Sequence, residues 1–171
     1  MPHGRTEDFT RFAHDSYDEL LRMAYLICAR DRTLAEDLLQ TALLKTYLHW
    51  NRIDDKSRAR SYVRATMIND FVRTTRRAIP VSSDSINVLA DHTQTDDSYR
   101  LADLRMDLAT ALSHLPPRQR VAVVLRYYIG LSERQSASEF SCSLAAIKSL
   151  AVRGLNGLNA ELDPKKEDAH E

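Results

Sequence analysis

Apolar residues recur at helical spacing in two long blocks of this 171-residue chain, and a stretch near its middle lacks that repeat. The blocks cover about 1–78 and 101–162, and in neither does strict apolar–polar alternation run long enough to indicate a strand. Residues 79–100 are rich in Ser, Asp and Thr, which is typical of a linker. The pattern therefore predicts an all-α protein with two small helical domains, a flexible linker at 79–100 and a disordered tail at 163–171.

Capping residues and apolar stripes predict the individual helices. One helix is expected from Thr10 to Cys28, and the next begins with a capping box formed by Thr33 and Glu36. Helical patterns follow at about 60–77 and from about 101. Pro117 suits the first turn of a further helix. The inward face of that helix is expected to hold Val121, Val124, Leu125 and Tyr128.

Residues 131–155 have the pattern of two short helices joined by a tight polar turn. Ser132 and Gln135 have the spacing of a capping box for the first helix, and Ser143 can cap the second. A helix-turn-helix motif usually places its second helix in a DNA groove. This second helix carries only Lys148 and Arg153 as cations, and such pairs also occur in ordinary bundles. The motif alone leaves both interpretations open.

The zero net charge of the chain hides an uneven distribution. Residues 1–80 hold 14 basic and 11 acidic residues, residues 81–100 hold 1 and 4, and residues 101–160 hold 7 and 4. Two mildly basic blocks are thus separated by an acidic linker. This distribution argues against a generic polyanion binder but allows local basic faces that hold phosphate.

The densest basic cluster lies at 52–77, where eight cations stand against three acids and Tyr62 and Phe71 are interleaved. Cations mixed with aromatics suit a surface that follows a phosphate backbone and receives unstacked bases. The alternative is that both aromatic rings are buried and the arginines only solvate a helix. Composition alone does not separate the two.

Several function classes have no support in the sequence. The six histidines are scattered, and there is no Gly-rich phosphate loop or nucleophile elbow, so we expect no metal, no cofactor and no enzyme. We expect a cytoplasmic protein without membrane insertion, because the chain lacks a long apolar run and a signal-type start. Cys28 and Cys142 are expected to be reduced thiols that pack.

Four segments carry a resemblance through their sequence, their order and their separations: AYLICARDRTLAEDLLQTALLKTYLHW, SYVRATMINDFVR, LSHLPPRQRVAVVLRYYIGLSERQSASEF and CSLAAIKS. Together they resemble the extracytoplasmic-function (ECF) group of bacterial RNA polymerase sigma factors, in particular the small actinobacterial SigE-family type. The resemblance implies a region 2 helical bundle at 1–78 and a region 4 helix-turn-helix domain at 101–162. The implied partners are core RNA polymerase, promoter DNA and an anti-sigma factor.

The resemblance also implies roles for individual residues. The residues implied to dock on the β′ clamp helices are Glu36, Asp37, Leu38 and Gln40. Recognition and melting of the minus-ten element fall to Arg60, Tyr62, Arg64, Asn69, Arg73, Arg76 and Arg77, with Asn69 near the pocket for a flipped base. Region 4, which also contacts the β flap, is expected to read the minus-thirty-five element through Ser143, Ala145, Ala146, Lys148, Ser149 and Arg153. The linker acids, Asp84, Asp91, Asp96 and Asp97, could mimic nucleic-acid charge in the polymerase channel.

Some positions depart from the family pattern. Ser141 stands where a glycine with positive φ is common, and Asp70 places an acid beside the expected base pocket. Gly154 and Gly157 are expected to loosen the end of the recognition helix. Three functions stay open: an active ECF sigma factor, a degenerate relative that binds polymerase or an anti-sigma factor without initiating, and a conventional helix-turn-helix regulator.

Overall fold

A computed structural model describes residues 2–77 and 99–163, and every regular element in these two ranges is helical. The helices are α1 (Pro2–Ile27), α2 (Arg32–His49), α3 (Ala59–Arg77), α4 (Tyr99–His114), α5 (Pro117–Val123), α6 (Glu133–Phe140) and α7 (Leu144–Glu161). Short turns are η1 (Trp50–Arg52), η2 (Lys56–Arg58) and η3 (Val124–Tyr128). The all-α prediction is confirmed. The predicted linker up to residue 98 and the predicted tail from 164 lie outside the described residues.

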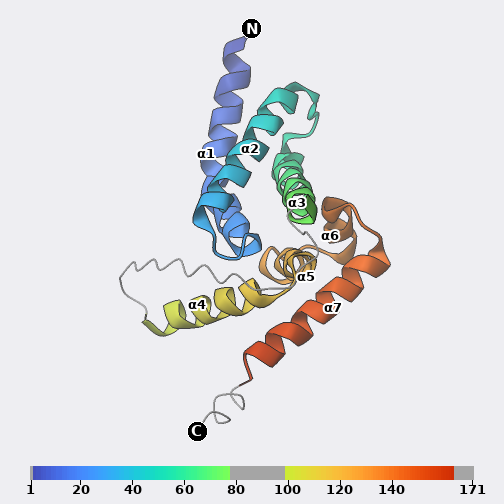
Figure 1. The fold of residues 1–171 in the computed structure, drawn as a ribbon. Helices are drawn as coiled ribbons and strands as arrows, with labels where there is room; N and C mark the ends of the chain where they lie inside the picture. The colour runs from blue at the N-terminus through green and yellow to red at the C-terminus, as the bar shows by residue number, and fades with distance from the viewer. Residues whose placement is uncertain (1, 78–98, 164–171) are drawn as a thin grey trace.

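Helices α1, α2 and α3 form one bundle, and helices α4 to α7 form a second group below it in Figure 1. The first bundle buries Met23 and Ile27 of α1, Leu39 of α2 and Met67 of α3 completely. Cys28 is buried beside them, and burial raises the pKa of its thiol to about 12. The thiol is therefore neutral, in agreement with the expectation that Cys28 packs in the core.

The turn between α1 and α2 overturns one predicted cap. Ala29 and Arg30 adopt left-handed backbone conformations, with φ of 54° and 70°, and end α1. This places Asp31 at the N-cap, where its carboxylate accepts a 2.9 Å hydrogen bond from the Leu34 N–H. Glu36 instead pairs with Arg32 at 2.9 Å. The capping box predicted for Thr33 and Glu36 is therefore wrong.

The helix-turn-helix turns behave as the sequence predicts. The Ser132 Oγ accepts from the Gln135 N–H at 3.1 Å, and the Ser132 N–H donates to the Gln135 side chain at 2.9 Å, which completes the capping box. The Ser143 Oγ caps α7 by accepting from the Ala146 N–H at 3.1 Å. Between the helices, Ser141 has φ of 52°, a left-handed conformation that costs a non-glycine residue about 1 kcal/mol.

A wide turn at the end of α5 changes which residues face inward. In η3 the Ile129 N–H donates to the Val124 carbonyl at 2.9 Å. This bond joins residues five positions apart, instead of the four of a regular α-helix. The extra residue in the turn shifts the side chains that follow it around the helix axis. Tyr128 is 47% exposed, so the prediction that it faces inward is wrong, whereas Val124 and Leu125 are buried as expected.

The two glycines of α7 have a packing role that sequence propensity does not reveal. A Cβ on Gly154 would lie 2.4 Å from Val123 Cγ2 and 3.1 Å from the Gln119 carbonyl oxygen. A Cβ on Gly157 would lie 2.6 Å from Leu115 Cδ2. The absence of side chains lets α7 approach α5 and Leu115 at the α4–α5 junction closely, a role that was not part of the expectation that these glycines loosen the helix.

Replacing Gly154 by Ala is expected to lower the free energy of unfolding by about 1–3 kcal/mol, because overpacking outweighs the gain of about 1 kcal/mol in helix propensity. Urea denaturation measures the change. Gly4→Ala is the control, since a Cβ at Gly4 meets nothing within 4 Å. A Gly154→Ala protein more stable than wild type would contradict the packing role.

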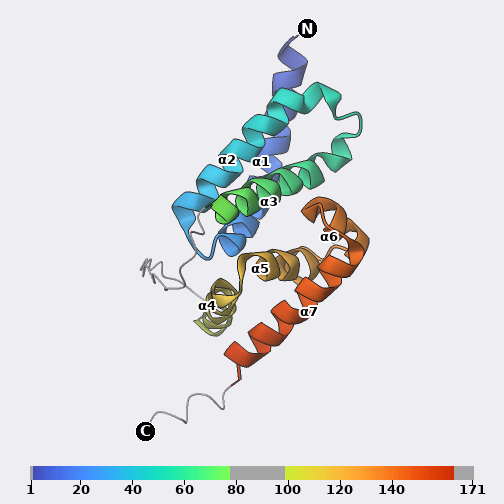
Figure 2. The ribbon, with the colours of Figure 1, turned by 45° about the vertical axis from the view of Figure 1, so that its right-hand side comes forward.

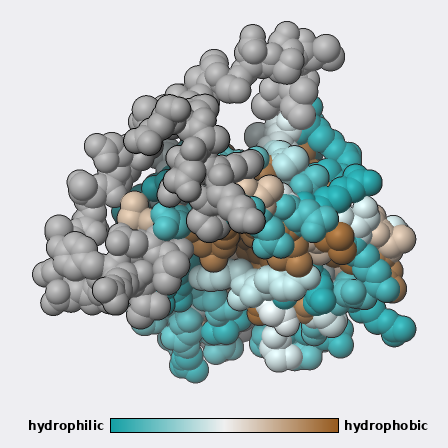
Figure 3. All heavy atoms as spheres, turned by 90° about the horizontal axis from the view of Figure 1, so that it is seen from below, coloured by the Kyte–Doolittle hydropathy of each residue, from teal (hydrophilic) through white to brown (hydrophobic). Residues whose placement is uncertain are grey.

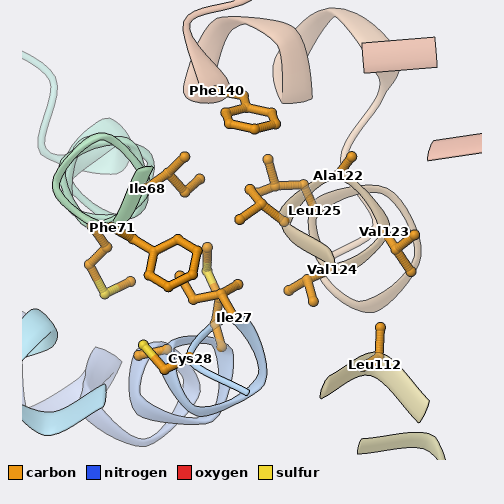
Figure 4. Close-up of a cluster of buried hydrophobic side chains, with 14 of the residues drawn as sticks. Ile27, Cys28, Ile68, Phe71, Leu112, Ala122, Val123, Val124, Leu125 and Phe140 are labelled. Atoms are coloured by element: carbon orange, nitrogen blue, oxygen red, sulfur yellow. The ribbon is translucent and has the colours of Figure 1, made fainter. Parts of the chain in front are cut away.

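The two groups of helices share one apolar core. Ile27, Ile68 and Phe71 of the first bundle face Leu125 and Phe140 of the second group (Figure 4), and all belong to one cluster of buried residues. Figure 2 shows α6 beside α3 and α5 beneath α1 to α3 in a second view. Nothing in the apolar repeat of the sequence predicts this joint core.

Candidate polymerase and nucleic-acid interfaces

The residues expected to dock on polymerase divide between two faces of α2. Asp37 and Gln40 are exposed, whereas Leu38 is only 8% exposed and belongs to the core. Glu36 is half-buried and pairs with Arg32. Only Asp37 and Gln40 of the four thus stand free of the packing against α1 and α3.

A stripe of leucines on the exposed face of α2 was not identified from the sequence. Leu34, Leu44 and Leu48 are 39%, 60% and 64% exposed. Together with Asp37 they follow one another at spacings of three, seven and four residues, so they lie along one side of the helix. The signal was present in the sequence as a second apolar stripe beside the buried one. Large apolar side chains gathered on one face mark an interaction surface.

The residues expected to contact the minus-ten element spread along α3. Asn69, Arg73, Arg76 and Arg77 are exposed near its end, where they line a pocket of about 530 Å³ together with Arg118 and Phe140. Near its start, Arg60 binds Glu19 at 3.0 Å and Ser16 at 3.0 Å, and Tyr62 is half-buried. Phe71 is 4% exposed and packs in the core, so for this ring the alternative interpretation holds.

The acid beside the expected base pocket is neutralised by two cations. The Asp70 carboxylate accepts from Lys45 Nζ at 2.6 and 2.8 Å and from Arg73 Nη2 at 2.5 Å. Asp70 therefore adds little net negative charge near Asn69. The surface at this end of α3 stays cationic through Arg76 and Arg77.

Arg64 lies in the first half of α3 but does not face solvent. Its guanidinium is buried and donates from Nε and Nη2 to the two carboxylate oxygens of Glu139 on α6, at 2.8 and 2.7 Å. Ser61 Oγ donates to the same carboxylate at 2.6 Å. This bidentate pair joins the first bundle to the helix-turn-helix group.

The residues expected to read the minus-thirty-five element lie at the start and along one side of α7. Ser143, Ala145, Lys148, Ser149 and Arg153 are exposed, and Ala146 is half-buried. Lys148 Nζ lies 3.3 Å from a Glu133 carboxylate oxygen in a surface pair. Val152, which the sequence reasoning missed, is 57% exposed on the same side and adds an apolar contact group.

An apolar groove of about 860 Å³ lies between α1, α4, η3 and α7. Its walls include Leu26, Leu108, Leu112 and Tyr127, and Figure 3 shows hydrophobic side chains gathered on this side of the molecule, with hydrophilic ones around them. Arg22, Arg30 and Arg105 also line it. The groove is separate from the exposed faces of α2 and α7.

Neither a metal site nor a membrane span is evident in the described ranges. Between 2–77 and 99–163 no three His, Cys, Asp or Glu side chains gather as metal ligands would. No helix in these ranges has the length and apolar character needed to cross a bilayer.

Comparisons with known proteins match both groups of helices. The family model for Sigma-70 region 2 matches residues 12–78, and that for Sigma-70, region 4 matches residues 105–156. The RNA polymerase sigma-E factor of Streptomyces avermitilis is 36% identical over 169 residues, which cover 99% of this chain and 93% of that protein. The ECF RNA polymerase sigma factor SigM of Bacillus subtilis is 27% identical and covers 90% of this chain and 92% of that protein.

Solved structures agree on the fold. The sigma factor RpoE of Bartonella quintana, in a complex with the anti-sigma factor NepR, gives a TM-score of 0.68 at 23% identity and covers 91% of this chain and 97% of that one. CnrH in complex with the cytosolic domain of CnrY gives 0.64 at 18% identity, with 92% and 89% covered. Two region models and a full-length relative at 36% identity establish the family. The chain belongs to the ECF family of RNA polymerase sigma factors, proteins that are not enzymes and that direct the polymerase to promoters.

Proposed function

We propose that this sigma factor docks on the β′ clamp helices of core RNA polymerase through the exposed face of α2. The observation that carries the proposal is the juxtaposition of Asp37 and Gln40 with the exposed leucines Leu44 and Leu48. Charged and amide groups can bond to a basic and polar partner, while the leucines bury apolar area. The β flap is the second contact, made by region 4.

The end of α3 is the proposed minus-ten surface. Asn69 is exposed and can bond to the edge of a flipped base, and Arg73, Arg76 and Arg77 are placed to hold the backbone. Extruding a base costs a few kcal/mol, which edge hydrogen bonds and stacking must recover. Arg60, Tyr62 and Arg64 extend the surface toward the start of α3, and Arg64 can join it only after it leaves Glu139.

Helix α7 is the proposed reader of the minus-thirty-five element. Its exposed side carries small residues, Val152 and the two cations Lys148 and Arg153. A lightly charged reader suffices because polymerase presents two DNA-binding surfaces at once, and the second contact forms at high effective concentration. Fit to the shape of the groove then contributes to sequence choice alongside charge.

Replacing Lys148 and Arg153 together by Ala is expected to weaken protection of the upstream promoter element several-fold, with a lower salt dependence because two phosphate contacts are lost. Footprinting of the polymerase complex at two salt concentrations measures the effect. An unchanged footprint would remove both residues from the reader.

The activity itself is tested by run-off transcription with purified core polymerase, the full-length chain and genomic fragments. Specific transcripts are the expected result. Core binding without an open complex would instead favour a degenerate relative that only binds polymerase or an anti-sigma factor. We place the protein in the cytoplasm with its polymerase. An anti-sigma factor is its proposed regulator, by likeness to the sigma factor RpoE, whose structure holds it in complex with the anti-sigma factor NepR.

A further inference from the structure

The pair between Arg64 and Glu139 links two parts of the chain that are 75 residues apart. Arg64 is 9% exposed and Glu139 is 5% exposed, so both charges have left water. Two guanidinium nitrogens reach two carboxylate oxygens, and the Ser61 hydroxyl occupies a further acceptor position. A buried pair of this kind is well satisfied as a unit, but either charge alone would be strongly unfavourable in the same place.

Other polar contacts cross the same boundary. Arg120 of α5 donates from Nε to the Ile27 carbonyl at the end of α1, at 2.9 Å. Arg30 donates from Nη1 to the Thr110 hydroxyl of α4 at 2.8 Å. With the shared apolar core, these contacts hold region 4 against region 2 in one closed arrangement.

The closed arrangement conflicts with the use of Arg64 on DNA. Its guanidinium is enclosed between α3 and α6, and both of its bonded nitrogens are taken by Glu139. Phe140 and Arg118 of region 4 also form one wall of the pocket that contains Asn69. Promoter DNA that contacts Arg64 in the first half of α3 must therefore displace α6.

We propose that the Arg64–Glu139 pair is an intramolecular latch, which keeps the free sigma factor closed and holds Arg64 away from promoter DNA until regions 2 and 4 separate. The closure does not depend on the promoter roles assigned above, whereas its effect on DNA binding rests on them. Glu139 thus restrains DNA binding by the sigma factor, although it belongs to the helix-turn-helix group.

The test uses the full-length chain with Glu139→Gln. Loss of the carboxylate charge leaves Arg64 buried without a counter-ion, a state that separation of the regions relieves because the guanidinium becomes hydrated. We expect the radius of gyration from small-angle X-ray scattering to increase over wild type, while circular dichroism shows the same helix content. Fluorescence anisotropy with a dye-labelled single-stranded DNA of mixed sequence, about 20 nucleotides long, is expected to show binding about tenfold tighter than that of wild type. This is the gain expected if the open, DNA-binding state makes up only about 10% of the wild-type protein.

Two further variants separate the latch from a general packing effect. Glu133→Gln makes the same chemical change on the same helix, in a surface pair, and is expected to leave the radius of gyration as in wild type. Arg64→Glu alone is expected to open the protein, and Arg64→Glu combined with Glu139→Arg to restore the compact form.

An unchanged radius of gyration and unchanged DNA affinity in a well-folded Glu139→Gln protein would overturn the latch. Expansion without tighter DNA binding would confirm the closure but reject its role in restraining DNA. Run-off transcription by the wild-type chain is measured separately, and its failure would count against the proposed promoter function. The scattering experiment would still test whether regions 2 and 4 are closed on each other.

Discussion

Replacing Asp37 by Arg is expected to abolish binding of this sigma factor to core RNA polymerase while leaving its helices intact. Asp37 is exposed on α2, so the substitution removes no core contact, and surface changes of this kind alter stability by about 0.5 kcal/mol or less. At the proposed polymerase interface, however, a cation would replace an anion opposite the basic partner that we expect there. Like charges brought together there cost several kcal/mol, which corresponds to a loss of affinity of about a hundredfold or more.

Co-elution of the variant with purified core polymerase on size exclusion, followed by a titration of fluorescently labelled sigma factor, measures the loss. Asp18→Arg is the matched control. Asp18 is an exposed acid on α1, so this substitution makes the same charge reversal on a helix other than the one that carries the leucine stripe. Equal affinity of the Asp37→Arg protein and wild type would show that α2 does not dock through this face.

Local signals in the sequence were sufficient for most of the helices and for the helix-turn-helix caps. Ser132, Gln135 and Ser143 bond to backbone groups three residues away, so the local sequence is enough to predict these bonds. The capping box predicted for Thr33 is wrong because the left-handed backbone of Ala29 and Arg30 ends α1 and places Asp31, two residues before Thr33, at the N-cap of α2. Two candidate caps two residues apart cannot be ranked without that turn.

The error at Tyr128 and the missed packing role of Gly154 and Gly157 have a different cause. A single wide turn in η3 directs the Tyr128 side chain toward solvent, and no residue type in the sequence predicts such a turn. The packing role of the α7 glycines depends on the proximity of α5 to Gly154 and of Leu115 to Gly157. Helix propensity describes an isolated helix. In α7 we expect tertiary packing, and not propensity, to decide whether replacing a glycine raises or lowers stability.

The candidate interfaces show the same division. Periodicity could place Asp37 and Gln40 on the open side of α2, and it could have found the leucine stripe beside them. It could not show that Arg64 is covered by α6, because Glu139 lies 75 residues further along the chain. An arginine in a basic helix is most often exposed, and only the second domain reverses that expectation for Arg64.

Arg120→Met is the second substitution for which we expect a large effect, here on stability. Arg120 is 5% exposed and donates to three main-chain carbonyls, those of Ile27, Ser113 and Leu115, at 2.9, 3.1 and 3.0 Å. Burial lowers the pKa of its guanidinium, but an arginine stays charged, so these carbonyls replace the water that a cation needs. Methionine fills a similar volume and leaves all three carbonyls without this donor.

The free energy of unfolding of the Arg120→Met protein is expected to fall by about 3–5 kcal/mol, since each buried group left without its partner costs about 1–3 kcal/mol. Urea denaturation followed by circular dichroism measures the fall. Arg118→Met on the same helix is the control, because Arg118 is half-buried and its guanidinium lies 5.1 Å from the centre of the Phe140 ring, a contact worth about 1 kcal/mol. If both variants lost the same small amount, Arg120 would be only a surface-like cation, and the tie that it makes between the end of α1 and the α4–α5 junction would not stabilise the closed protein.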